Sequence, residues 1–376
     1  MEARTAQSVA GPKDAALTRT EFQSLPGFAS DDLLSAWRTF SSSCRALLNR
    51  VASIRPALEP DPVLLGSLRR IAQAAAPVTQ SEARAFFEDH FQPWHIISPE
   101  RQGFVTGYYE PEVEGARAKS LEFTTPLLSR PVDLVSPLPP SAFPLAASGL
   151  SAGRYGVDGG FLPYPRRAEI ERGALGDKAH PVAWVRDATE AYLIHVQGSA
   201  RIRLSDGQTL RLTYAGRNGL PYTSIGKILI EGGLIREKDM TLAALKDWLR
   251  ADAERGAALM RQNRSYIFFK IDEDAKGDEG PIGGAGLRLS PLRSIAIDRT
   301  CWPYGLPFWI EAKLPWLGSA ASDFNRLMIA QDTGSAILGP ARADIFFGSG
   351  DAAGVRAGDI RHPAAFTVLL PREIQP

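Results

Sequence analysis

The spacing of apolar residues changes near Gly103, and this change constrains the fold more than any other feature of the sequence. Before it, apolar residues from Leu33 to Val51 recur at steps of three and four positions, which predicts an amphipathic helix. The preceding Ser30-Asp31-Asp32 stretch is typical of a helix cap with an acidic first turn. Two more helices are predicted, at about 62–75 and at 81–90 behind a capping-box-like stretch at 79–82. We therefore expect the first hundred residues to be helical.

After this point the chain is rich in short β-type runs separated by turns. The Gly103–Tyr109 run of β-branched and aromatic residues predicts a strand. Further strands are predicted in the middle of the chain, at 123–128, 182–185, 191–197, 200–204 and 209–214. Helices return at 224–231 and 242–260, and the last third is again predicted to hold strands, at 265–271, 293–297, 308–312, 326–331, 343–347 and 366–370. The order α, β, α, β favours an α+β protein, mainly β, in which a middle β domain interrupts a larger one.

The composition is that of an ordinary globular protein. With 376 residues the chain is long enough for about two domains, and a net charge of +1 gives no reason to expect nucleic acid as a partner. No run of 18 apolar residues occurs, so no transmembrane helix is predicted. Cys44 and Cys301 lie far apart in unlike contexts, which favours two semi-buried free thiols, while a single disulfide between them stays open.

Sequence patterns give no support for a metal or a cofactor, and we expect neither. The five histidines, at positions 90, 95, 180, 195 and 362, form no HExxH motif or comparable ligand array. There is also no nucleophile elbow, phosphate-binding loop or dinucleotide fingerprint. The glycine-rich run Gly283-Gly284-Ala285-Gly286 is expected to be a tight turn rather than a phosphate cradle.

Three aspartates in the last third are the best candidates for chemistry. Asp298, Asp332 and Asp344 each begin or end a β-type segment with apolar neighbours. Burial among apolar side chains raises the pKa of a carboxyl group, so that it can donate a proton near neutral pH. The pattern alone is also typical of turn formers and of backbone hydrogen-bond acceptors, and both interpretations stay open.

Several blocks of the sequence resemble the membrane-bound lytic murein transglycosylase A (MltA) family. They are Gly107-Tyr108-Tyr109-Glu110-Pro111, Val196-Gln197-Gly198-Ser199, Tyr214-Ala215-Gly216-Arg217-Asn218-Gly219 and Ser224-Ile225-Gly226-Lys227. The three aspartates are similar to the C-terminal 3D region of that family, which is named for its three Asp. The resemblance runs from about residue 103 to 371, with the blocks in the order of the family. One departure is Ser335, which stands where the family has a glycine and would be strained if the position needs a positive φ.

The resemblance implies a fold and a division into domains. It implies a double-ψ β-barrel catalytic domain with surrounding helices, built from residues 21–111 and 216–376, with the 3D region at about 281–371. An inserted small β-barrel domain, residues 112–215, is expected to form the other wall of a glycan groove. Residues 1–20 are polar and are expected to be a mobile N-terminal segment.

The resemblance also implies an activity, the non-hydrolytic cleavage of the β-1,4 bond between MurNAc and GlcNAc in peptidoglycan. The products carry 1,6-anhydro-MurNAc ends, and Asp344 is expected to act first as acid and then as base. Asp332 and Asp298 are expected to support it, either by tuning its proton affinity or by bracing loops, and these alternatives stay open. The expected substrate-binding residues are Tyr108, Tyr109, Gln197, Gly198, Ser199, Tyr214, Asn218, Thr333 and Gly334, although the three tyrosines could equally serve packing.

Two other functions remain as alternatives. One is a muramidase-type hydrolase, with Glu110 or Asp332 as a second carboxylate. The other is a non-catalytic peptidoglycan-binding protein that has kept the groove.

Location and partners follow from the expected substrate. The resemblance places the protein in the periplasm or at the outer membrane, and we expect peptidoglycan glycan strands as ligand, no nucleic acid, a monomeric state, and contact with cell-wall synthesis or division complexes. The chain begins without the basic-then-apolar pattern of a secretory signal or a lipobox cysteine. We therefore expect either that the native gene product carries a leader upstream or that the start of this sequence is artificial.

Overall fold

The computed structural model describes residues 8–10, 12, 15–98, 102–142, 146–374 and 376. The chain divides into two compact units. The first, which we name the barrel unit, consists of Met1–Tyr108, Ile282–Gly348 and Arg356–Pro376. The second, the inserted unit, consists of Tyr109–Pro281 and Ser349–Val355. Each unit is described by itself.

The barrel unit is built on a closed six-stranded β-barrel. Its strands are β4 (Phe104–Glu110), β13 (Ser294–Ile297), β14 (Pro307–Leu314), β15 (Ser322–Thr333), β16 (Arg342–Ser349) and β17 (Arg361–Pro371). They are joined in the order β17-β14-β15-β13-β16-β4, and pairing of β4 with β17 closes the ring. β13 runs parallel to β15, whereas β14 is antiparallel to both of its neighbours. Strands β3 (Phe91–Ile97), β2 (Ala16–Arg19) and β1 (Ser8–Ala10) extend the sheet beyond β17.

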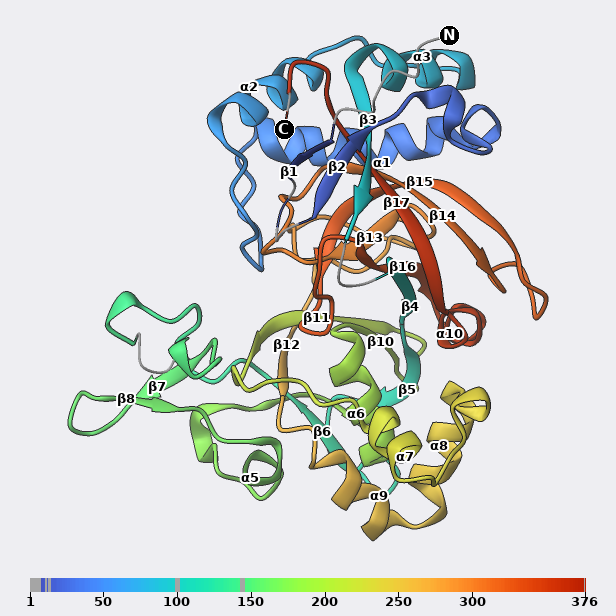
Figure 1. The fold of residues 1–376 in the computed structure, drawn as a ribbon. Coiled ribbons are helices and arrows are strands. Elements are labelled where there is room, and N and C mark those ends of the chain that lie inside the picture. The colour runs from blue at the N-terminus through green and yellow to red at the C-terminus, as the bar shows by residue number, and fades with distance from the viewer. Residues whose placement is uncertain (1–7, 11, 13–14, 99–101, 143–145, 375) are drawn as a thin grey trace, which may run out of the picture. The chain divides into compact units, whose positions relative to one another are not determined.

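Three helices pack together on one side of this barrel (Figure 1). They are α1 (Leu33–Leu48), α2 (Pro62–Ile71) and α3 (Gln80–His90). The apolar stripes of α1 and α3 meet in edge-on ring contacts, such as that of Phe40 with Phe87, and Phe40 also contacts Phe91 of β3 edge-on. The predicted capping box is present at the start of α3, where Thr79 accepts from the Glu82 N–H and the Glu82 carboxylate accepts from the Thr79 N–H.

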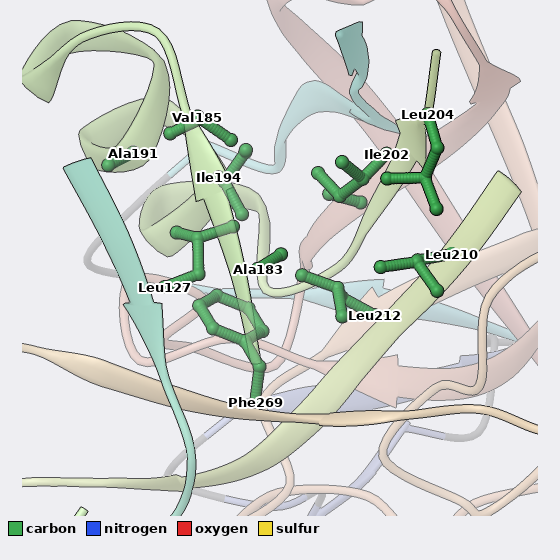
Figure 2. Close-up of a cluster of buried hydrophobic side chains, with 11 residues drawn as sticks. Leu127, Ala183, Val185, Ala191, Ile194, Ile202, Leu204, Leu210, Leu212 and Phe269 are labelled. Atoms are coloured by element: carbon green, nitrogen blue, oxygen red, sulfur yellow. The ribbon is translucent and has the colours of Figure 1, made fainter. Parts of the chain in front are cut away.

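The inserted unit contains a second six-stranded sheet. Its strands, in spatial order, are β12 (Ile267–Ile271), β11 (Thr209–Arg217), β10 (Ala200–Arg203), β5 (Glu112–Ala116), β9 (Pro181–Val185) and β6 (Thr125–Leu128). A single bridge between Ser129 and Phe269 links the two edges and closes the sheet into a small barrel. Leu127, Ile194, Ile202, Leu212 and Phe269 point toward one another in its core (Figure 2).

The remaining elements of the inserted unit surround this sheet. They are β7 (Gly153–Tyr155), β8 (Phe161–Pro163), α5 (Arg167–Glu171), α6 (Ala188–Gln197), α7 (Ile225–Glu231), α8 (Leu242–Ala251) and α9 (Ala253–Met260). Helix α10 (Asp351–Gly358) crosses the boundary between the units along the chain. Short 3-10 helices lie at Phe22–Ser24, Phe28–Ser30, Pro140–Ala142, Gly176–Lys178 and Glu237–Asp239.

The predicted fold class is confirmed: the protein is α+β, mainly β, with one barrel interrupted by another. Some local predictions were wrong. Residues 191–197 are not a strand but the second half of α6, a helix buried on nearly all sides, so that its sequence has no polar face to reveal the helical period. The predicted helix at 242–260 is two helices, because Asp252 leaves the helical conformation to cap α9.

The N-terminal segment also differs from the prediction. Residues 16–19 form β2, which pairs with β3 and is therefore part of the barrel unit rather than a mobile tail. Residues 1–7, 11, 13 and 14 lie outside the described part of the chain. Cys44 and Cys301 are buried thiols that form no disulfide with each other, and burial raises the pKa of Cys44 to about 12. Within the described residues, no helix is long and apolar enough to cross a membrane.

Candidate active site

Strand β13 brings two of the three aspartates into one row of the barrel. Ala296 on β13 is the register partner of Asp332 on β15 and of Asp344 on β16. Residues in one row across neighbouring strands point to the same face of the sheet, so the two carboxyl groups share a face, with Cα atoms about 10 Å apart, two strand spacings. Asp298 directly follows the end of β13. Two of the three aspartates therefore lie on the strands that flank β13, and the third lies at the end of β13 itself.

The surroundings of Asp344 raise its pKa above the usual value of an aspartate. Thr106 Oγ1 on β4 donates to Asp344 Oδ1 at 2.7 Å, and the same hydroxyl accepts from Arg342 Nη2 at 2.7 Å. Burial raises the pKa of Asp344 to about 6, against the opposing effects of the Arg342 charge and the Thr106 hydrogen bond, and the Asp332 charge raises it further. Near neutral pH this carboxyl group can therefore both give and take a proton.

Asp332 differs from Asp344 in its contacts, because several donors surround its carboxylate. Arg55 Nη2 and the Gly284 N–H both lie 2.7 Å from Oδ1, and the Thr333 N–H lies 2.8 Å from the same atom. The Tyr108 hydroxyl donates to Oδ2 at 2.9 Å. These donors hold the carboxylate in place and occupy acceptor positions that a substrate or a water could otherwise use.

Asp298 braces two loops. Its Oδ1 accepts from the N–H and the hydroxyl of Thr300, at 2.9 and 2.7 Å, and its Oδ2 accepts from the Gly339 N–H at 2.8 Å. The residue is 1% exposed. Of the two interpretations left open for this aspartate, the contacts favour the structural one.

The glycine-rich run is a tight turn, as expected, and it also positions Asp332. Gly284 donates its N–H to Asp332, and its carbonyl accepts from the Arg55 N–H at 3.0 Å. A Cβ at Gly284 would lie 2.5 Å from the Tyr304 hydroxyl oxygen and 3.3 Å from Asp332 Oδ1. Only glycine therefore allows this close approach.

Three other predicted site residues, Tyr108, Thr333 and Gly334, lie in the barrel unit. Tyr108 is half-buried and is held by Asp332, with its ring 5.3 Å from that of Phe346. Thr333 is buried and donates its hydroxyl to the Ile297 carbonyl at 2.9 Å, so this hydroxyl serves the barrel. Gly334 and Ser335 form the turn after β15, and Ser335 does not have a positive φ, so the departure from the family pattern brings no strain.

Four predicted residues come together in the inserted unit. Gln197 Oε1 accepts from the Tyr109 N–H at 3.1 Å. Gly198, with φ of 87°, ends α6 in the left-handed conformation that glycine favours, and Ser199 directly after it is buried. Tyr109 is buried beside Gly354, and burial together with the Asp351 charge raises its pKa to about 12.

The structure does not support substrate binding by Asn218. This residue has no exposed surface, and its side chain bonds the carbonyls of Pro165 and Arg264 and the N–H of Tyr266, each at 2.9 Å. It is a structural residue, because every one of these bonds cross-links the backbone of the inserted unit. Tyr214 is half-buried on β11, at a β-bulge opposite Phe269.

Glu110 has partners of its own within the inserted unit. Its Oε2 accepts from Arg201 Nε at 2.7 Å, from Arg211 Nη2 at 3.4 Å and from the Ser349 hydroxyl at 2.6 Å. With 1% exposure it is a buried, ion-paired carboxylate. Such a group is a poor nucleophile, because two guanidinium groups already stabilise its charge.

Sequence reasoning missed the residues that give the two aspartates their different environments. Thr106 lies two positions before the recognised Tyr108, on the same face of β4, and could have been found from strand alternation. Arg342 stands two positions before Asp344 on β16 and offers the same signal. Arg55 gave no signal, since it lies in a segment without regular structure, 277 residues before its partner. Among the described residues, no group of three or more potential metal ligands lies together.

A closed barrel with three aspartates on adjacent strands, one of them able to donate a proton near neutral pH, defines a protein of the 3D-domain class. The chain matches two family models, the MltA specific insert domain over residues 104–270 and the 3D domain over residues 293–370. It belongs to the MltA family of lytic murein transglycosylases.

Individual relatives agree with this assignment. The membrane-bound lytic murein transglycosylase A of Vibrio cholerae is 37% identical over 206 residues, which cover 53% of this chain and 54% of the relative, so the match spans about half of that protein. The crystal structure of a membrane-bound lytic murein transglycosylase from Agrobacterium tumefaciens is similar with a TM-score of 0.82 and 34% identity, covering 94% of this chain and 97% of that chain. The crystal structure of E. coli MltA with bound chitohexaose has a TM-score of 0.62 and 25% identity, covering 98% and 93%.

Proposed function

We propose that this protein is a peptidoglycan lytic transglycosylase in which Asp344 is the only acid and base. It cleaves the β-1,4 bond between MurNAc and GlcNAc without water and leaves a 1,6-anhydro-MurNAc end. The observation that carries this proposal is the difference between Asp344 and Asp332. The pKa of Asp344 is raised to about 6, whereas the Asp332 carboxylate accepts hydrogen bonds from an arginine, a tyrosine and two backbone N–H groups.

The reaction balances with a single carboxyl group. Protonated Asp344 gives its proton to the glycosidic oxygen as the bond from that oxygen to C1 of MurNAc breaks, which frees the 4-hydroxyl of GlcNAc. The Asp344 carboxylate then takes the proton of the C6 hydroxyl of the same MurNAc while O6 bonds to C1. Asp344 ends protonated, as it began, so no second protein acid is needed. A pKa near 6 suits a group that must do both steps.

The surroundings of Asp344 serve both of its protonation states. The Thr106 hydroxyl stabilises the carboxylate once the proton has left, and Arg342 orients that hydroxyl by donating to it. Burial favours the protonated form. The two effects oppose each other, which keeps the energies of the two forms close.

A muramidase-type hydrolase is less well supported, because it needs a second carboxylate free to act as nucleophile or base. Asp332 is held by four donors, and Glu110 is buried with two arginines. A purely glycan-binding protein would gain nothing from an aspartic acid whose burial costs stability at neutral pH.

The substrate class rests on relatives. One family member has been crystallised with chitohexaose, an oligomer of GlcNAc, and others carry murein in their names. We propose that Tyr108 borders a sugar site in the barrel unit, and that Tyr109, Gln197 and Tyr214 contact glycan in the inserted unit. A periplasmic or outer-membrane location, a monomeric state and contact with cell-wall synthesis complexes belong to the same proposal.

Digestion of purified sacculi, followed by mass spectrometry of the muropeptides, tests the reaction. Anhydro-muropeptides, lighter by one water than their reducing counterparts and free of label in H₂¹⁸O, are expected. Reducing ends that carry ¹⁸O would indicate the hydrolase instead.

The role of Asp344 is tested by Asp344→Asn, which keeps the size of the side chain but can neither donate nor accept the proton. Turnover should fall by about 10²–10⁴-fold or more. Asp323→Asn is a matched control, because this aspartate lies on β15 of the same barrel with its side chain 70% exposed. Asp344→Asn with more than about a tenth of wild-type turnover would remove Asp344 from the mechanism, since even the smallest general-acid contribution exceeds that.

A further inference from the structure

The segment from Val51 to Pro60 has no regular structure, yet it reaches the aspartate row. One side of it lines a cavity of about 550 Å³, together with residues of α1 and α2. Because this side has little to pack against, the segment depends on a few polar contacts for its position. Three of them involve Arg55.

Arg55 contacts three residues at or beside the candidate site, through both its backbone and its side chain. Its N–H donates to the Gly284 carbonyl at 3.0 Å, its carbonyl accepts from the Tyr304 hydroxyl at 2.9 Å, and its guanidinium contacts Asp332 at 2.7 Å. Gly284 in turn donates to Asp332. Backbone and side chain of Arg55 therefore hold the same carboxylate, directly and through the glycine turn.

This ion pair is shielded from solvent. The side chain of Asp332 is 8% exposed and that of Arg55 is 23% exposed, so salt and water screen the two charges only weakly. Around Asp344 the charged or titratable neighbours are Arg342 on its own strand, Tyr108 on β4 and Asp332 on β15. Of these groups, Asp332 carries the one negative charge, and Arg55 is the cation that contacts it.

We propose that Arg55 is a positioning residue for the transglycosylase reaction. It holds Asp332 against Gly284 and Tyr108, and its positive charge compensates the negative charge of Asp332 that Asp344 faces. This inference rests on the proposed function of Asp344 and extends it to a residue outside both matched family domains. Without Arg55, the uncompensated Asp332 carboxylate would disfavour a second negative charge on Asp344.

The test is the titration of Asp344 and the pH dependence of turnover in Arg55→Gln. The Asp344 carboxyl carbon, assigned by its absence in Asp344→Asn, is followed by NMR in the full chain labelled with ¹³C-aspartate. We expect an upward shift of roughly 0.5 to 1 pH unit in Arg55→Gln, and an equal shift of the alkaline limb of turnover on sacculi. Arg55→Lys, which keeps the charge, should shift both by less than half as much.

Arg299→Gln is the matched control for loosening the segment. Arg299 Nη1 donates to the Pro56 carbonyl at 3.0 Å, so its loss should loosen the segment and leave the Asp344 titration unchanged. A shift in Arg299→Gln equal to that in Arg55→Gln would overturn the proposal, and so would an unchanged titration in Arg55→Gln.

A double variant separates charge from structure. In Arg55→Gln/Asp332→Asn no charge is left unpaired, so the Asp344 titration should return to that of Asp332→Asn alone, and the melting temperature should lie above that of Arg55→Gln. Failure of both Arg55→Gln and the double variant to fold would contradict a role confined to Asp332. Because the NMR titration needs no turnover, a shift in inactive protein would support the Arg55 proposal while the proposed function failed.

Discussion

Thr106 on β4 and Asp344 on β16 are joined by a hydroxyl-to-carboxylate hydrogen bond of 2.7 Å, across 238 residues of chain. The hydroxyl has a single proton, and because Arg342 already donates to its oxygen, that proton is directed to Asp344. The bond favours the carboxylate form and so lowers a pKa that burial raises. Thr106 thus sets how far the pKa of the proposed acid can rise.

Replacement of this hydroxyl should move the pH dependence of the reaction. Thr106→Val keeps the shape but loses the bond to the carboxylate, so the pKa of Asp344 should rise above about 6, by up to roughly one unit. The alkaline limb of turnover on sacculi should move upward by the same amount, because Asp344 stays protonated to higher pH. Thr106→Ser, which retains the hydroxyl, should behave like wild type, and a downward shift in Thr106→Val would contradict this account.

Asp298 should be needed for stability more than for chemistry. Asp298→Asn loses its charge and replaces one acceptor oxygen with a donor group, so that either the Thr300 N–H or the Gly339 N–H loses its acceptor. We expect a loss of about 1 to 3 kcal/mol in the free energy of unfolding, with turnover at low temperature reduced far less than in Asp344→Asn. Urea unfolding and turnover of the same preparation are the measurements, and a stable but inactive Asp298→Asn would assign this residue to the reaction instead.

Features that depend on neighbouring residues could be predicted from the sequence. The capping box at Thr79 and Glu82 was confirmed, because its partners lie three residues apart. Asp31, interpreted as part of a helix cap, instead forms a buried ion pair with Arg293, whose Nη1 and Nη2 lie 2.7 and 2.8 Å from its carboxylate oxygens. That partner is 262 residues away, and only the folded chain brings the two together.

The same limit applies to the aspartate row. The three positions can be found from their apolar neighbours, but the pattern around Asp344 and around Asp332 is alike in sequence. What separates the two is a set of non-local partners: a hydroxyl from β4 for Asp344, and Arg55 with the Gly284 N–H for Asp332. The chemical role of an aspartate depends on such contacts, and therefore local sequence cannot show which of the three is the proton donor.

The inserted unit should lose stability in acid because of His195. A guanidinium can only donate, so the 3.0 Å contact of Arg167 Nη1 with His195 Nδ1 places the ring proton on Nε2. Burial, and then the Arg167 charge, hold the pKa of His195 well below its usual value of 6.5. The other neighbours of this group are Tyr266, whose ring is 4.2 Å away, and Glu171, 3.8 Å from Arg167.

The sign follows from proton binding in the two states. Above pH 6.5 His195 is neutral in both, whereas below it the unfolded chain gains a proton that the folded unit cannot take, so stability falls with falling pH. Hydrogen exchange of α6 and β12 at pH 7 and pH 5 measures this. His195→Gln, which still offers Arg167 an acceptor but cannot titrate, should lose part of the acid sensitivity, and equal sensitivity in both proteins would exclude His195 as the cause.

Asp344 should show the reverse dependence, because its pKa is raised on folding. The carboxyl group titrates near pH 6 in the folded barrel unit and near 3.8 when unfolded. Between these values the folded state binds more protons, so the contribution of this group to stability is present below about pH 4 and is lost as pH rises through 6.

Asp344→Asn cannot titrate and should therefore gain stability relative to wild type over this window. The gain at pH 7.5 should be about 1 to 3 kcal/mol, where the upper value corresponds to a shift of about two pKa units. Urea unfolding of both proteins at pH 4.5 and 7.5 measures the difference, with Asp323→Asn as the exposed control. A difference that is the same at both pH values, or larger at pH 4.5, would mean that folding does not raise the pKa of Asp344.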